Sequence, residues 1–83
     1  MNAGLTYDRR TRAGQEREII ERIAKYGGFS VFWITENQKR AHAADRLENA
    51  GVIYRDNDDG PHLFPWIKMK IDARNIEWKI PYA

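Results

Sequence analysis

Five polar side chains between positions 38 and 49 are spaced like successive turns of one helix. They are Gln38, Lys39, His42, Arg46 and Asn49. Amide and guanidinium groups at this spacing can hydrogen-bond to base edges in a DNA major groove, and an ammonium group can contact a phosphate. The alternative is a solvated outer face, because any amphipathic helix presents polar groups to water.

The helix that must position these groups has recognisable start and stop signals. Thr35 and Gln38 have the three-residue spacing of a capping box. Gly51 offers the left-handed residue on which helices commonly end, and the β-branched residues after it favour extended chain. We therefore predict a helix from Glu36 to Ala50. Its expected core side consists of Ala41, Ala44, Leu47 and Gly51, flanked by Ala43 and Ala50.

A first helix is predicted upstream, from Gln15 to Tyr26, and the two glycines that follow should end it. Its apolar stripe is Ile19, Ile20, Ile23 and Ala24. The segment from Phe29 to Ile34 is aromatic and β-branched with apolar residues on both faces, which predicts a short buried strand. Residues 1–14 lack periodicity and are expected to form a loose arm before a single domain over residues 15–83.

Two extended runs downstream, Val52 to Arg55 and Leu63 to Ile71, flank turn formers and predict an antiparallel hairpin. In the second run one expected face is buried and the other is aromatic and basic. The buried set is Ile67, Met69 and Ile71, and the outer set is Trp66, Lys68 and Lys70. Pro65 lacks an amide donor, so its part of the strand should lie at an edge or a bulge. The run from Ile76 to Ile80 is a candidate third strand.

The predicted helices and strands make up one α+β domain, and the composition fits a reducing compartment. The 83 residues are 42% hydrophobic, which suffices for one modest core. Because cysteine is absent, a disulfide framework and thiolate metal sites are excluded. No apolar run is long enough to cross a bilayer, and the first residues do not resemble a signal peptide. We expect a cytoplasmic protein without a membrane partner.

The distribution of charge is uneven although the net charge is only +2. Both ends of the chain are basic, whereas the turn from Asp56 to Asp59 is acidic. A turn that touched phosphate would be expected to be basic. The sequence therefore lacks the broad basic patch of a strong nonspecific DNA binder.

The residues give little support for catalysis, so we expect no enzymatic activity, no cofactor and no metal. His42 and His62 have no carboxylate at a spacing that would orient them, which favours solvated histidines. The acidic turn resembles a calcium loop at first sight. However, Pro61 and Ile67 stand where that loop needs glycine and glutamate.

The order of a helix, a short strand, a polar-faced helix and a hairpin resembles the winged-helix group of DNA-binding domains over Glu16 to Ile71. The residues that carry the resemblance are Arg46 and Leu47, followed by Ala50, Gly51, Val52 and Ile53. The resemblance implies a double-stranded DNA partner, and a regulatory role is expected from it. It places Asn57 to His62 at the wing tip. The residues expected to face DNA are Gln38, Lys39, His42, Arg46 and Asn49, with Lys68 and Lys70 on the hairpin. Such short proteins are common among phage and prophage gene products, which the resemblance makes a plausible origin.

The aromatic residues support an alternative reading as a protein-binding module that inhibits or modulates a larger partner. One small core cannot readily cover all of them, so some should lie at the surface. The candidate interface residues are Phe64, Trp66, Trp78 and Tyr82. Homodimer formation through the carboxy-terminal strand is a further possibility, because an unpaired strand edge is sticky.

Overall fold

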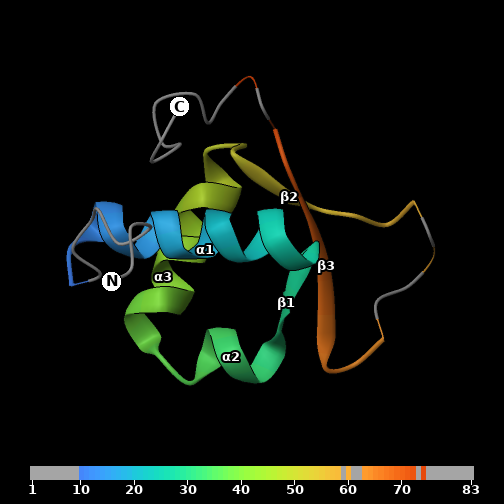
Figure 1. The fold of residues 1–83 in the computed structure, drawn as a ribbon, viewed down its shortest axis with the longest axis horizontal. Coiled ribbons are helices and arrows are strands. Elements are labelled where there is room, and N and C mark those ends of the chain that lie inside the picture. Colours follow the sequence, from blue (N-terminus) through green and yellow to red (C-terminus); the bar gives the residue numbers. More distant parts are fainter. Residues whose placement is uncertain (1–9, 59, 61–62, 73, 75–83) are drawn as a thin grey trace.

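The computed structural model describes residues 10–58, 60, 63–72 and 74. Its elements are α1 (Arg12–Tyr26), β1 (Gly28–Ser30), α2 (Val31–Thr35), α3 (Gln38–Asn49), β2 (Ile53–Arg55) and β3 (Trp66–Ile71). The helices gather on one side and the β2–β3 hairpin extends on the other (Figure 1). The predicted α+β class is confirmed: the described residues form three helices and one three-stranded antiparallel sheet, an arrangement consistent with a small winged-helix-like domain. The candidate third strand, together with Trp78 and Tyr82, lies outside the described residues.

The three strands form one antiparallel sheet in the order β1-β3-β2. The first half of β3 pairs with β1, with Trp66 opposite Ser30, and the second half pairs with β2, with Ile71 opposite Ile53. The predicted hairpin is therefore present, but its second strand begins at Trp66 instead of Leu63. Pro65 lies just before the strand, where its missing amide donor costs no ladder bond.

The core lies between α1, α3 and the sheet. Its buried apolar residues include Ile19, Ile20, Ile23, Phe29, Ile34, Ala43, Ala44, Leu47, Val52, Ile53 and Met69, with Ile67 and Ile71 packed against them. On the predicted inner face of β3, Met69 is buried and Ile67 and Ile71 are partly buried against the core. On α3 the core side is rotated from the prediction, because α1 packs against α3. Ala43 is fully buried, whereas Ala41 is half-buried and Ala50 and Gly51 are exposed. On α1, Ala24 is exposed although it was assigned to the apolar stripe.

The segment from Phe29 to Ile34 is not the single strand that its composition predicts. β1 ends at Ser30, whose hydroxyl oxygen accepts the backbone N–H of Trp33 at 3.0 Å and caps the short helix α2. At the other end of α2, the backbone N–H of Glu36 donates to the carbonyl of Phe32. A serine cap and burial of Ile34 therefore outweigh the strand preference of β-branched and aromatic residues.

The caps of the two longer helices also differ from the prediction. Asn37, not Thr35, caps α3, since its side-chain oxygen accepts the N–H groups of Lys39 and Arg40 at 3.0 and 3.2 Å. The Thr35 hydroxyl instead donates to the carbonyl of Val31 within α2. α1 begins at Arg12 and is capped by Thr11, so part of the predicted loose arm is helical. Gly27 and Gly51 have the left-handed conformation expected at helix ends.

Within the described part of the chain, no helix is both long and apolar enough to cross a bilayer.

Candidate nucleic-acid interface

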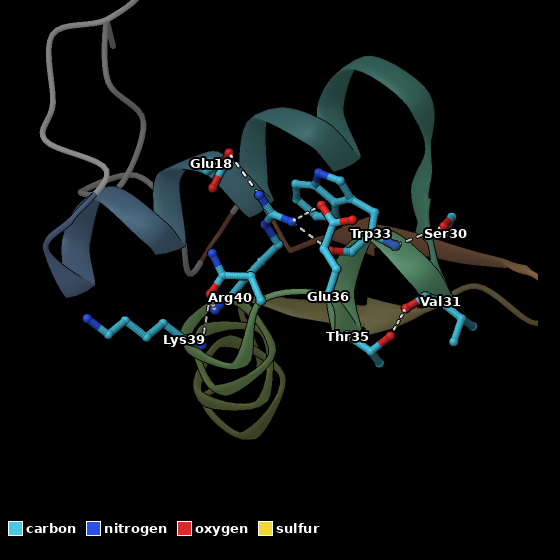
Figure 2. Close-up of polar contacts among 9 residues, drawn as sticks. Glu18, Ser30, Val31, Trp33, Thr35, Glu36, Lys39 and Arg40 are labelled. Atoms are coloured by element: carbon cyan, nitrogen blue, oxygen red, sulfur yellow. Dashed lines mark hydrogen bonds and ion pairs between the residues drawn. The ribbon is translucent and has the colours of Figure 1, made fainter.

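The joint between α2 and α3 is held by Arg40, which lies in the first turn of α3. Its guanidinium group donates to the carbonyl oxygen of Trp33 at 2.7 Å and to Glu36 at 3.1 Å, and it lies 3.6 Å from a carboxylate oxygen of Glu18 on α1 (Figure 2). The Arg40 side chain is only 13% exposed. One side chain therefore connects all three helices and sets the direction in which α3 leaves the joint.

The indole ring of Trp33 completes this joint. Arg40 lies over the ring at 4.1 Å from its centre, and Arg22 of α1 lies 4.2 Å from the same centre. Two guanidinium groups thus contact the π-system of one tryptophan, a favourable arrangement when the groups are partly desolvated. Arg40 is not among the predicted site residues, although a basic residue in the first turn of a helix is electrostatically disfavoured and is a signal that could have identified it.

The polar residues expected on the outside of α3 are found there, with one exception. Gln38, Lys39, His42 and Asn49 are exposed. Arg46 is half-buried, and its Nε donates to Glu16 of α1 at 2.9 Å. The Glu16 side chain is only 13% exposed, so this ion pair also ties α3 to α1. Arg46 is therefore less available to a partner than its sequence spacing suggests.

A basic pocket lies where the beginning of α1 meets the outer flank of α3. Its volume is about 300 Å³. Its lining residues are Arg10, Arg12, Gln15, Lys39, His42 and Arg46. Three of these six belong to the predicted DNA-facing set, whereas Arg10, Arg12 and Gln15 were not assigned to it. The sequence signal that could have identified them is the cluster of arginines before the first helix.

The hairpin presents a different electrostatic surface. The ammonium group of Lys70 lies 3.8 Å from Asp56 and 3.6 Å from Asp58, and these carboxylates raise its pKa above the ordinary value. Lys68 is half-buried on β3. Both lysines predicted as DNA contacts are therefore less available to a partner than the sequence suggests, because Lys70 is paired with acids and Lys68 is partly covered.

An aromatic patch, formed by Phe32, Leu63 and Phe64, lies near the start of β3. The rings of Phe32 and Phe64 meet edge to face with their centres 5.5 Å apart. They are 59% and 76% exposed, and Leu63 is 74% exposed. Phe64 thus lies at the surface as the interface reading expected, while Trp66 is half-buried. The exposure of Phe32 was not predicted, because its segment was expected to form a buried strand.

Among the described residues, no group of three or more histidine and acidic side chains is arranged to hold a metal ion. The sequence has no significant match to a protein-family model, a curated protein or a solved structure.

Proposed function

We propose that the protein is a regulatory DNA-binding protein that inserts α3 into the major groove of duplex DNA. The observation that carries this proposal is the outer side of α3. Gln38, His42 and Asn49 are exposed on one side of a helix whose opposite side is buried. Two amides and an imidazole in this arrangement can hydrogen-bond to base edges, because the major groove admits one helix.

The joint around Arg40 supports the same proposal. A recognition helix must be held rigidly, since a small displacement of its side chains loses hydrogen bonds to the bases. The contacts of Arg40 with Trp33 and with two acidic residues fix the first turn of α3 against α1 and α2. Gln38 and Lys39 extend from this fixed turn into solvent.

The roles proposed for the residues of α3 follow from their chemistry. Gln38 and Asn49 would read bases, since a planar amide can pair with adenine in two hydrogen bonds. Lys39 would contact a phosphate as a point charge. Arg46 would orient the neighbouring groups through its ion pair with Glu16, and only its remaining donors would face the nucleic acid.

Binding of a random-sequence duplex between about 50 and 200 mM salt tests the proposal, because phosphate contacts release counterions and give steep salt dependence. We expect Lys39→Ala to lower the slope of that dependence by about one. Lys25→Ala is the matched control, since it removes an exposed lysine from the last turn of α1, away from the polar side of α3. Equal slopes for the two variants, or a parent that does not bind duplex at low salt, would overturn the proposal.

Selection of preferred sites from a random pool tests base reading separately. Gln38→Ala and Asn49→Ala should each weaken discrimination at the selected site by about 1–3 kcal/mol. Thermal stability should change little, because both side chains are exposed. A pool that shows no enriched sequence for the parent would mean that α3 does not read bases.

A second candidate function, protein binding, is supported by the aromatic patch. Exposed aromatic side chains that contact each other are typical anchors of protein interfaces. A second copy of this chain is the partner that can be tested directly, by sedimentation over a range of concentrations. Phe64→Ser should reduce association, whereas Tyr54→Ser, which alters a separate exposed aromatic residue on β2, should not. A parent that stays monomeric throughout would count against this second function.

A further inference from the structure

We propose that the basic pocket is a binding site for a single phosphate group, which Arg12, Lys39, His42 and Arg46 would contact. This inference deepens the proposed function and rests on it in one respect. If the protein binds duplex DNA, the group is a backbone phosphate beside the groove that α3 enters. The same chemistry would also accept a small phosphate ester.

The charge of the pocket is the first argument for this ligand. Four of its six lining residues carry a guanidinium or ammonium group, and none of the six is acidic. The carboxylate of Glu16 is directed to the Nε of Arg46 at 2.9 Å. A guanidinium group such as that of the exposed Arg12 offers a planar pair of donors, which matches the oxygens of phosphate better than a single neutral acceptor.

An unsatisfied donor at the wall of the pocket also favours an anionic ligand. Nη2 of Arg46 is buried and has no hydrogen-bond partner. A buried donor without an acceptor is costly, and the cost is larger for a charged group. The ion pair with Glu16 holds this guanidinium at the wall of the pocket. A phosphate oxygen that entered the pocket, with a small rotation of the side chain, would supply the missing acceptor.

The first turns of the two helices beside the pocket carry basic residues. The macrodipole of a helix favours acidic residues in its first turn and disfavours basic ones. Neither α1 nor α3 has an acidic residue there, and each instead has a basic pocket residue, Arg12 in α1 and Lys39 in α3. This arrangement works against the stability of the empty protein. An anion in the pocket would offset the repulsion between these basic side chains and the positive ends of their helices.

The size of the pocket fits a phosphate group together with part of its ester. Its 300 Å³ lies at the lower end of the range of small-molecule sites. Gln15, of which 8% is exposed, forms part of the wall. Its Nε2 donates one N–H to the carbonyl of Arg10 at 3.5 Å, and the second N–H can hydrogen-bond to an ester oxygen.

The test is an NMR titration of the intact chain with inorganic phosphate, followed by a titration with random-sequence duplex DNA. We expect saturable shifts at the amides of Arg12, Lys39 and His42. Arg12→Gln should weaken phosphate binding about tenfold, as expected for the loss of one charge-assisted hydrogen bond. Lys25→Gln is the matched control, since it removes an exposed charge from the far end of α1 and should leave the affinity unchanged. Arg12 is exposed, so its replacement should leave the fold intact.

The outcomes separate this inference from the proposed function. Saturable phosphate binding that Arg12→Gln weakens, with parallel weakening of duplex binding, supports both. Saturable phosphate binding without duplex binding supports the pocket, identifies a small phosphate ester as the source and contradicts the proposed function. If Arg12→Gln and Lys25→Gln reduce duplex binding equally, the phosphate site in the pocket is contradicted and the proposed function stands. Amide shifts that increase linearly with phosphate concentration and extend to Lys25 would also contradict the phosphate site.

Discussion

At the scale of single residues, Arg40 and Arg46 show how surroundings separate two identical side chains on one helix. Arg40 is 13% exposed and holds α3 against α1 and α2, while 34% of the Arg46 side chain is exposed at the wall of the basic pocket. Both are paired with acidic residues of α1, namely Glu18 and Glu16. Arg40 therefore mainly stabilises the packing of the helices, whereas Arg46 both contacts α1 and lines the candidate site.

Replacement of Arg40 by alanine should destabilise the protein by about 2–3 kcal/mol, because it removes a hydrogen bond to a backbone carbonyl, two ion pairs and a cation–π contact. Thermal unfolding followed by circular dichroism should show a Tm lower by roughly 10–20 °C. Lys39→Ala, the exposed neighbour, should change stability by less than about 0.5 kcal/mol. Equal melting temperatures for the two variants would show that the joint does not depend on Arg40.

At the scale of elements, short-range hydrogen bonds decide where the helices begin. The region from Ser30 to Asn37 contains three residues able to cap a helix. Ser30 caps α2, Asn37 caps α3, and the Thr35 hydroxyl donates to a carbonyl inside α2. The resulting turn between the two helices sets the position of Gln38 and Lys39, so the caps determine where the polar side of α3 starts.

Asn37→Ala should destabilise the protein by about 1 kcal/mol, since two backbone N–H groups at the start of α3 lose their acceptor. Thr35→Ala should have a smaller effect, because its hydroxyl bond is exposed and caps no helix. Urea unfolding of both variants beside the parent measures the difference. A larger loss for Thr35→Ala would restore the capping box that the sequence suggested.

Gly28 holds β1 against β3 by its lack of a side chain. A Cβ at this position would overlap the backbone carbonyl of Ile67 on β3, whereas a Cβ on Gly27 would meet nothing. Gly27→Ala should therefore cost only the strain of its left-handed conformation, about 1–2 kcal/mol. Gly28→Ala should lower the melting temperature further or prevent folding altogether. Similar melting temperatures would indicate that β1 can move away from β3 at little cost.

At the scale of the whole molecule, the charges divide the surface into unlike regions. Basic side chains converge where α1 meets α3, while the hairpin carries carboxylates around Lys70. Because the pKa of Lys70 is raised, the stabilisation from its ion pairs is present at neutral pH and is lost as the pH rises above the ordinary lysine value of 10.5. At neutral pH the hairpin should therefore add little attraction for phosphate.

Asp58→Asn should strengthen duplex binding and steepen its salt dependence, because it removes a carboxylate that would repel phosphate and leaves Lys70 with one acidic partner fewer. Glu21→Gln on α1 makes the same change in net charge away from the hairpin and serves as the control. Duplex titrations at two salt concentrations measure both. Equal effects would mean that only net charge matters and that the hairpin does not approach DNA.

The sequence by itself determined the features that depend on neighbours along the chain. Helical periodicity located most of α1 and α3, the glycines marked their ends, and alternation assigned Ile67, Met69 and Ile71 to the core. These features follow from spacing along one element, so no tertiary contact is needed to read them. The polar side of α3 could be predicted from the sequence for the same reason.

Only the tertiary structure decided which of several local options the chain adopts and which charges meet. Propensity favoured a strand from Phe29 to Ile34, but a serine cap and the burial of Ile34 stabilise α2 instead. Two ion pairs join separate helices, Arg46 with Glu16 and Arg40 with Glu18. The basic pocket is likewise lined by residues of two helices, among them Arg12 and Lys39. No periodicity within one element encodes such contacts, because they depend on how α1 lies against α3.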